Sequence, residues 1–160
     1  MRSLLFCLFG LLLFASCSEE RQLLNRIEGV FDTTEFIVTD ATTGDVLFTA
    51  SPTFQFVECD PNSNRDGGQC DMTIIDTSGT SYDYRYQLDV SNEGNDFITF
   101  QPLPGFSTDQ NDLTRALTGQ LAVEIRDEEL RMYTSDEALG GRSVIQGSRD
   151  YRVSITADKR

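Results

Sequence analysis

The chain has 160 residues and a formal net charge of −13 at pH 7, with 26 acidic residues, 13 basic residues and no histidine. Such an acidic chain is repelled by nucleic acid, because affinity for nucleic acid depends on Lys and Arg meeting phosphates. Without histidine the chain lacks the usual general base near neutral pH and the His-dependent catalytic dyads and triads. We therefore expect no nucleic-acid partner, no enzymatic activity and no cofactor.

The excess of acidic residues has two possible interpretations, and the sequence does not decide between them. Lys159 is the only lysine, and the other basic residues are arginines. An acidic surface with scarce lysine is typical of proteins adapted to high salt, where screening reduces self-repulsion. It is equally typical of a secreted protein that is kept soluble by its charge.

The first sixteen residues have the order of a signal peptide. Arg2 is followed by the apolar run Leu4–Ala15 and then by a small residue and a cysteine. The run is shorter than the roughly 20 apolar residues that span a bilayer, and it fits a signal-peptide core. Phe14-Ala15-Ser16-Cys17 resembles the lipobox of bacterial lipoproteins, with phenylalanine where leucine is commoner. The resemblance implies that residues 1–16 are cleaved off and that Cys17 is lipidated; a signal peptide with an incidental Cys17 is the alternative.

Residues 17–22 are expected to be a tether that carries the lipid. Ser18-Glu19-Glu20 resembles the acidic tethers that send lipoproteins of some two-membrane bacteria to the outer face of the outer membrane. A solvated linker is the alternative interpretation of these three residues. Acylation at two positions gives a stable anchor, so we expect a cell-envelope protein that is lipid-anchored to the outer membrane. If Ser18-Glu19-Glu20 is such an acidic tether, the protein is also exposed on the cell surface.

Residues 23–160 are predicted to form one domain, and its first elements are a short helix and a long strand. Leu23, Leu24 and Ile27 have helical spacing, and Gly29 opens a β segment over Val30–Thr39. A turn at 43–45 follows, and Val46–Ala50 then extends or pairs with that segment.

The rest of the domain alternates between apolar and polar residues, as half-buried strands do. The clearest strand carries Tyr84, Tyr86, Leu88 and Val90 on one face. Similar alternation marks strands around Phe54, Met72, Ile98, Leu121, Leu130 and Val153, while 112–117 and 135–139 favour helical turns. These strands follow one another without βαβ units, which predicts an all-β fold: an antiparallel up-and-down meander of about eight strands, closed into a barrel.

A family resemblance supports the barrel. The helix 23–27, Gly29-Val30-Phe31, the meander and the final strand with Tyr151-Arg152-Val153 resemble the lipocalin-like domains of bacterial lipoproteins. That family has Gly-x-Trp in its first strand and a cation from its last strand over the tryptophan. The resemblance implies that Phe31 replaces the tryptophan, that Arg152 supplies the cation, and that the barrel can hold a small apolar molecule.

A polar loop between two cysteines is expected to be closed by a disulfide. In an oxidising extracytoplasmic compartment Cys59 and Cys70 are predicted to form a disulfide. The loop resembles the start of a calcium-binding loop, because the possible oxygen ligands Asn62, Asn64 and Asp66 alternate with other residues before Gly67. However, the glutamate that closes a calcium loop is missing, and Asn, Asp and Gly residues also form turns without a metal. We therefore predict no metal site; if the loop does bind calcium, these three residues are the candidate ligands.

Five aromatic residues are the candidate ligand wall inside the barrel: Phe54, Phe56, Tyr84, Tyr86 and Phe100. The alternative is plain core packing, since an eight-stranded barrel is narrow enough for side chains to fill it. The first function hypothesis is non-catalytic binding of a small apolar or amphipathic molecule. The second is an envelope or cell-surface interaction protein with a filled barrel that acts through loops such as 60–69 and 106–117. An enzyme that uses carboxylates is a distant third, because the acidic clusters fall at the tether or at turns.

Overall fold

The structure is a computed structural model of the chain, and it describes residues 21–59, 69–90, 95–103, 112–135, 143–145 and 149–160. The proposed signal peptide, Cys17 and most of the acidic tether lie outside the described residues, as do the candidate calcium ligands Asn62, Asn64 and Asp66. Among the described residues, no helix is long and apolar enough to cross a membrane.

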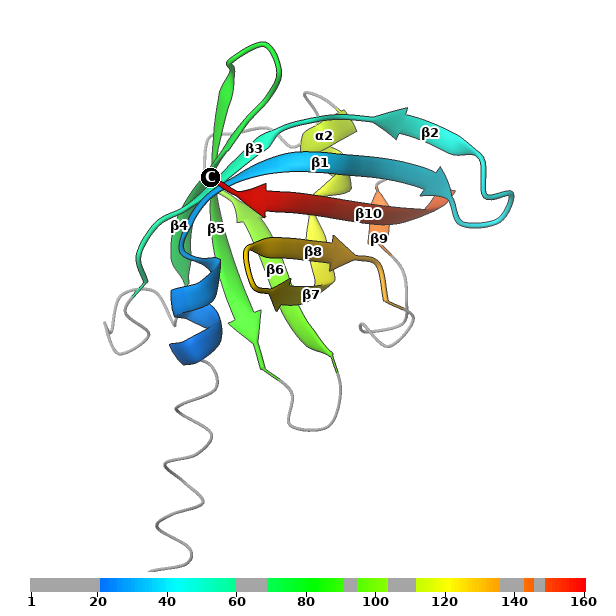
Figure 1. The fold of residues 1–160 in the computed structure, drawn as a ribbon. Coiled ribbons are helices and arrows are strands. Elements are labelled where there is room, and N and C mark those ends of the chain that lie inside the picture. Colours follow the sequence, from blue (N-terminus) through cyan, green and yellow to red (C-terminus); the bar gives the residue numbers. More distant parts are fainter. Residues whose placement is uncertain (1–20, 60–68, 91–94, 104–111, 136–142, 146–148) are drawn as a thin grey trace, which may run out of the picture.

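The described chain forms ten strands of one sheet and two short helical segments (Figure 1), and its buried apolar residues form one cluster. The strands are β1 (Gly29–Asp40), β2 (Val46–Thr49), β3 (Thr53–Phe56), β4 (Cys70–Ile75), β5 (Ser81–Asp89), β6 (Asp96–Pro102), β7 (Gly119–Arg126), β8 (Glu129–Tyr133), β9 (Ser143–Ile145) and β10 (Arg149–Lys159). The helix α2 spans Asp112–Ala116, between β6 and β7, and a further helical segment covers 21–27.

Eight of the strands close an antiparallel barrel, which confirms the predicted fold class. They run in the order β1-β3-β4-β5-β6-β7-β8-β10, and β10 pairs back onto β1 from Phe31↔Lys159 to Asp40↔Tyr151. The strand β2 pairs with the distal half of β1, and β9 pairs with the start of β10. The alternation pattern did not indicate β9, which is only three residues long.

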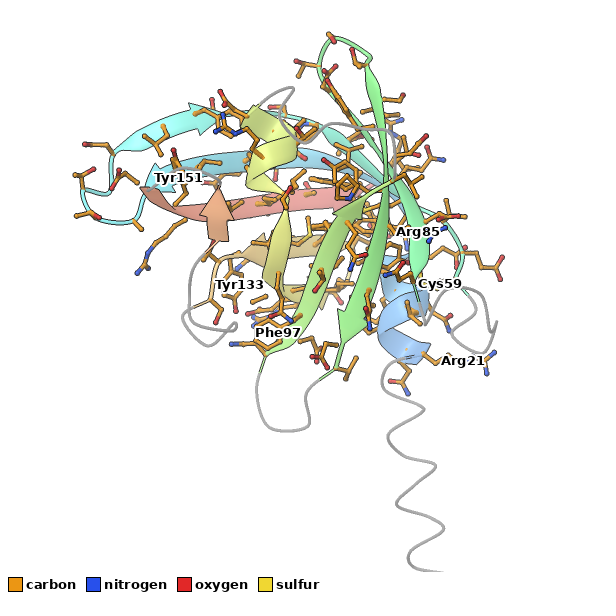
Figure 2. The ribbon with its side chains drawn as sticks, turned by 180° about the vertical axis from the view of Figure 1, so that it is seen from behind. Arg21, Cys59, Arg85, Phe97, Tyr133 and Tyr151 are labelled. Carbon is orange, nitrogen blue, oxygen red and sulfur yellow. A yellow bond between two sulfur atoms is a disulfide. The ribbon has the colours of Figure 1, made fainter. Side chains whose placement is uncertain are left out.

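The core follows the predicted alternation. In β5 the inward residues Tyr84, Tyr86 and Leu88 are buried, and the outward residues between them are exposed or half-buried. Neighbouring strands repeat this pattern because antiparallel pairing places inward residues opposite inward ones, as in the row Phe56↔Met72↔Tyr84. The barrel interior is therefore lined by apolar and aromatic side chains. Figure 2 shows the described side chains on the ribbon.

In an up-and-down barrel, alternate connections lie at the same end. The helix 21–27, the ends of β3, β5 and β10 and the starts of β4 and β6 therefore share one end, which we call the helix 21–27 end (Figure 1). Leu23, Leu24 and Ile27 are buried there, as their spacing predicts. The Arg26 guanidinium donates to the carbonyl oxygen of Ile125, which joins the helix to β7.

At the same end a cation lies over Phe31, but it is not the predicted Arg152. The Lys159 Nζ is 5.6 Å from the centroid of the Phe31 ring and donates to the carbonyl oxygen of Arg26 at 3.3 Å. Arg152 pairs in register with Thr39 and is exposed, so its assignment was wrong. The register between β1 and β10 explains the error, because the partner of Phe31 is the last residue of β10 and not its fourth.

Gly29 makes this closure possible. It has a φ of +130°, and a Cβ built on it would lie 2.8 Å from the Lys159 Cε. An L side chain would therefore meet both a strained backbone and the lysine stem that crosses to Phe31. The glycine of the Gly29-Val30-Phe31 motif is therefore favoured mainly by its backbone conformation.

Candidate functional site

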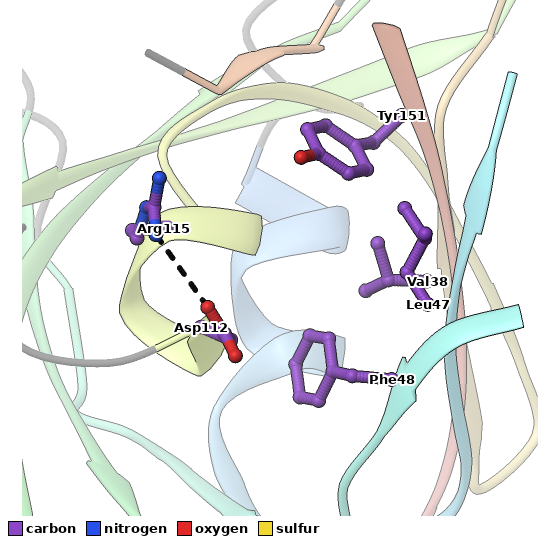
Figure 3. A pocket seen from close by; sticks show the side chains of 6 residues that line it. All are labelled: Val38, Leu47, Phe48, Asp112, Arg115 and Tyr151. Atoms are coloured by element: carbon purple, nitrogen blue, oxygen red, sulfur yellow. Dashed lines mark ion pairs between the residues drawn. The ribbon is translucent and has the colours of Figure 1, made fainter. Parts of the chain in front are cut away.

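The opposite end of the barrel carries α2 and a hollow beside it. The hollow has a volume of about 180 Å³, and it lies between α2 on one side and the β1, β2 and β10 ribbon on the other (Figure 3). Its lining consists of Val38, Leu47, Phe48, Asp112, Arg115 and Tyr151. One wall is therefore apolar and aromatic, and the other is charged.

The apolar wall comes from two paired strands. Val38 of β1 lies opposite Phe48 of β2, and the Phe48 ring packs at a tilt against Phe36 with 5.6 Å between ring centroids. Val38 is buried, Phe48 is half-buried and Leu47 is 37% exposed. Tyr151 extends this wall from β10, where it pairs with Asp40. Of these wall residues, Leu47 is exposed and Phe48 and Tyr151 are half-buried, so they can contact a molecule in the hollow.

The charged wall is α2 itself. The Asp112 Oδ1 lies 3.6 Å from the Nη1 of Arg115, one helical turn away. The Asp112 side chain is 72% exposed and the Arg115 side chain is 39% exposed. The opposite helix face carries Leu113, Thr114 and Ala116, all buried against the core. An exposed ion pair of this kind contributes little stability, so both groups can exchange partners at small cost.

A second hollow of about 230 Å³ adjoins the first and shares Phe48 and Asp112 with it. Its other lining residues are Ala50, Ser51, Pro52, Asp76, Thr77 and Leu113. Together the two hollows form a cleft between α2 and a wall made by β1, β2, β10 and the β2–β3 connection, which we call the α2 groove. Its size is within the range of sites for small ligands.

The five aromatic residues predicted as a ligand wall are brought together, but as the packed interior of the barrel. Each is at most 2% exposed. Phe56 is in contact with three rings, at centroid distances of 5.8 Å to Phe31, 6.4 Å to Phe54 and 5.2 Å to Tyr86. The α2 groove is built from a different set of described side chains.

The two buried tyrosines of β5 differ in how their hydroxyls are satisfied. The Tyr84 hydroxyl is hydrogen-bonded to the Thr114 side chain of α2, and burial raises the Tyr84 pKa to about 12. The Tyr86 hydroxyl is buried without a hydrogen-bond partner among the described residues, and burial, together with the nearby Glu28 carboxylate, raises the pKa of Tyr86 as well. Tyr84 thus links α2 to the barrel, whereas the unsatisfied hydroxyl of Tyr86 lowers the stability of the folded protein.

Replacing each tyrosine with phenylalanine should therefore affect stability differently. Tyr84→Phe is expected to lower the free energy of unfolding by about 1 kcal/mol, because it breaks a buried hydrogen bond. Tyr86→Phe is expected to leave it unchanged or raise it by up to about 1 kcal/mol, because it removes an unsatisfied hydroxyl. Urea denaturation of the two variants measures both changes. A larger loss for Tyr86→Phe than for Tyr84→Phe would contradict the assignment.

Asp76 shapes the rim of the groove at the turn between β4 and β5. Its Oδ1 accepts hydrogen bonds from the Ser78 amide at 2.8 Å, the Ser78 hydroxyl at 2.6 Å and the Thr80 amide at 2.9 Å, and its Oδ2 accepts one from the Tyr82 hydroxyl at 3.1 Å. These hydrogen bonds, that of the Ser78 side chain first, lower the pKa of Asp76 below its usual 3.8. The carboxylate therefore stays charged at neutral pH and rigidifies the turn.

The stabilisation by Asp76 should disappear in acid. A carboxyl whose folded-state pKa is lowered stabilises the protein above its unfolded pKa, and this stabilisation is lost as the pH falls through the folded value. The stability difference between the wild type and Asp76→Ala is thus expected to be full at pH 6 and to shrink below about pH 4. Thermal unfolding of both proteins from pH 6 to pH 2.5 measures it. A difference that grows in acid would contradict the role of the charged form.

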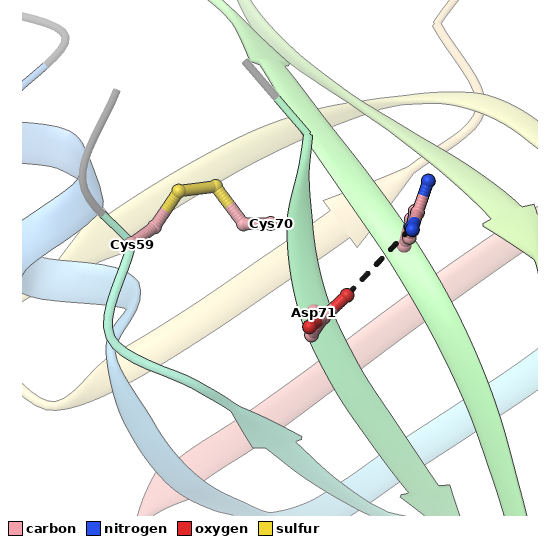
Figure 4. Close-up of a disulfide and its surroundings, with 4 residues drawn as sticks. Cys59, Cys70 and Asp71 are labelled. Carbon is pink, nitrogen blue, oxygen red and sulfur yellow. Dashed lines mark ion pairs between the residues drawn. A yellow bond between two sulfur atoms is a disulfide. The ribbon is translucent and has the colours of Figure 1, made fainter. Parts of the chain in front are cut away.

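The predicted disulfide is present at the helix 21–27 end (Figure 4). Cys59 and Cys70 are bonded with their Cα atoms 5.5 Å apart, and the bond joins the chain after β3 to the start of β4. Beside it, Asp71 forms an ion pair with Arg85 of β5 at 3.7 Å. Among the described residues, no group of three or more His, Cys, Asp or Glu side chains is placed to hold a metal ion.

None of the groove residues was predicted as a ligand-binding residue from the sequence. Asp112 and Arg115 had a local signal, an acidic and a basic residue one turn apart in a predicted helical turn. Phe48 and Tyr151 had none beyond being aromatic, because they meet only through pairing of β1 with both β2 and β10. The predicted loop 106–117 does contain α2, although its residues 106–111 are outside the described part of the chain.

Comparison with known proteins gave no match to a family model, a curated protein or a solved structure. The class of protein rests on the fold: a closed, antiparallel, eight-stranded β-barrel with one disulfide and a groove at one end.

Proposed function

We propose that the chain is a lipid-anchored protein of the cell envelope that binds a small amphipathic molecule without chemically changing it. The observation that carries the binding function is the α2 groove, which sets an apolar wall opposite a charged one. Ligand sites are concave and mostly apolar, with a few polar groups that fix orientation, and the groove has this composition. The proposal thus moves the binding site from the barrel interior to the end of the barrel.

The anchoring part of the proposal is supported by the sequence of residues 1–20. Cleavage before Cys17 and acylation of its thiol and amino group would hold the barrel at the outer membrane through the acidic tether. Fractionation of the producing cells tests this part separately. Cys17→Ser is expected to move the protein from the membrane fraction to the soluble fraction, and an unchanged distribution would overturn the anchor.

Native mass spectrometry of protein purified without detergent tests the binding function. We expect an added mass that disappears on denaturation and that is absent from a Phe48→Ser variant. The matched control is Val57→Ser, because Val57 is 47% exposed and follows β3 at the opposite end of the barrel. An added mass that survives in Phe48→Ser would place the ligand elsewhere, and a bare mass that no added amphiphile changes would overturn binding.

A second candidate function is a protein interaction, and one observation favours it. Val46 and Leu47 of β2 are 60% and 37% exposed, and β2 is the end strand of the sheet on its side. Exposed apolar residues on an edge strand are a frequent feature of interaction sites. Chemical crosslinking in intact cells with and without Val46→Arg tests it, since a specific partner would be lost in the variant.

A further inference from the structure

We propose that the molecule bound in the α2 groove is a cationic amphiphile: an amine next to a short apolar chain, with the Asp112 carboxylate as the partner of the amine. This inference rests on the proposed function, because it names the ligand class of the same groove. It is drawn from the charges and the aromatic side chains that line the groove.

The apolar part of the groove suits a short chain. Val38, Leu47 and Phe48 of β1 and β2 line the first hollow, which measures about 180 Å³. The second hollow of about 230 Å³ continues past Phe48 towards Pro52. These volumes hold a chain of a few carbons and a head group, and they are too small for a two-chain lipid.

The described charged groups of the groove are mainly negative. They are the carboxylates of Asp76 and Asp112 and the guanidinium of Arg115. Asp112 is 72% exposed and is held by Arg115 at 3.6 Å, and a carboxylate can accept about four hydrogen bonds, so it has acceptor capacity left for an ammonium group.

Two further features favour a cation. The rings of Phe48 and Tyr151 lie on the wall opposite α2 (Figure 3), and aromatic faces attract ammonium groups. In addition, the net charge of −13 raises the local concentration of cations near the protein and lowers that of anions. Both the short-range and the long-range electrostatics therefore select the same sign of ligand.

The experiment compares three probes with the same chain: hexylammonium, hexan-1-ol and hexanoate. Each is titrated into the purified ¹⁵N-labelled protein, and the amide shifts around Phe48, Asp112 and Tyr151 are followed by NMR. Hexylammonium is expected to bind at least about fivefold more tightly than hexan-1-ol, since one close charge pair in a water-exposed setting contributes about 1 kcal/mol. Hexanoate is expected to bind most weakly.

Two isosteric variants localise the effect. Asp112→Asn is expected to remove the preference for hexylammonium over hexan-1-ol while hexan-1-ol still binds. Asp89→Asn has the same change in net charge at an exposed position of β5, and it is expected to keep the preference. An equal loss in both variants would mean that the overall charge, and not Asp112, attracts the amine, which would overturn the assignment.

The remaining outcomes separate this inference from the proposed function. Equal binding of hexylammonium and hexan-1-ol, or tighter binding of hexanoate that Arg115→Gln removes, would overturn the cationic ligand and leave the binding groove intact. No shift at the groove with any of the three probes would overturn the groove as a binding site, and the inference with it.

Discussion

Replacing Phe56 with alanine is expected to lower the free energy of unfolding by about 3–5 kcal/mol, the range for deleting a buried aromatic side chain. Phe56 is 2% exposed and packs edge-on against Phe31 and Tyr86. These neighbours belong to β1 and β5, on either side of the β3–β4 pair, so the surroundings cannot collapse into the cavity without moving the sheet. Denaturation in urea, followed by near-ultraviolet circular dichroism of the tyrosines, measures the loss.

The control for this variant is Val57→Ala at the next position. Val57 is 47% exposed, and its replacement is expected to change stability by less than about 0.5 kcal/mol. The two variants differ in which side of the same chain segment they truncate. Similar losses in both, or a loss below about 1 kcal/mol for Phe56→Ala, would show that the barrel interior is not packed around this ring.

Removing the disulfide with a Cys59→Ser and Cys70→Ser double substitution is expected to cost about 3 kcal/mol. The bond closes a short loop, since the two cysteines are 11 positions apart, and its main effect is to restrict the unfolded chain. Because Cys70 begins β4 and is 4% exposed, the bond also holds that strand in register beside β3. Chemical denaturation of the variant and of the wild type gives the difference.

Reduction provides the matched control for the double variant. A phosphine reductant is expected to lower the stability of the wild type by a similar amount and to leave the double variant unchanged. A wild type that is insensitive to reductant while its thiols titrate as free would contradict a stabilising role of the bond. A further loss in the reduced double variant would mean that the reductant acts elsewhere in the protein.

Much of the barrel could be predicted because burial follows local alternation. Tyr84, Tyr86 and Leu88 are buried as their two-residue period indicates, and the same holds for Met72 and Ile74 in β4. In the short turn between β7 and β8, Asp127 has a φ of +54°, a conformation that aspartate tolerates. Alternation cannot predict very short strands, because the three residues of β9 are too few to show a two-residue period.

The groove could not be predicted in the same way. Phe48, Asp112 and Tyr151 are far apart in the sequence, and neither periodicity nor spacing relates them. Their meeting depends on the extension of β1 and β10 beyond the barrel and on the position of α2 against that extension. The five aromatic residues of the predicted ligand wall do face the barrel interior, but alternation reports only which side chains face inward, not whether they leave space between them.

The sequence by itself determined the all-β class, the antiparallel order, the residues of the core and the Cys59–Cys70 bond, because each of these follows from neighbours along the chain or from two cysteines closing one short loop. Only the tertiary structure decided which cation covers Phe31 and where the groove lies. Closing the barrel sets the register of β10 on β1, so Lys159 and not Arg152 reaches the ring. Register is a property of two strands more than a hundred residues apart, and no local pattern encodes it.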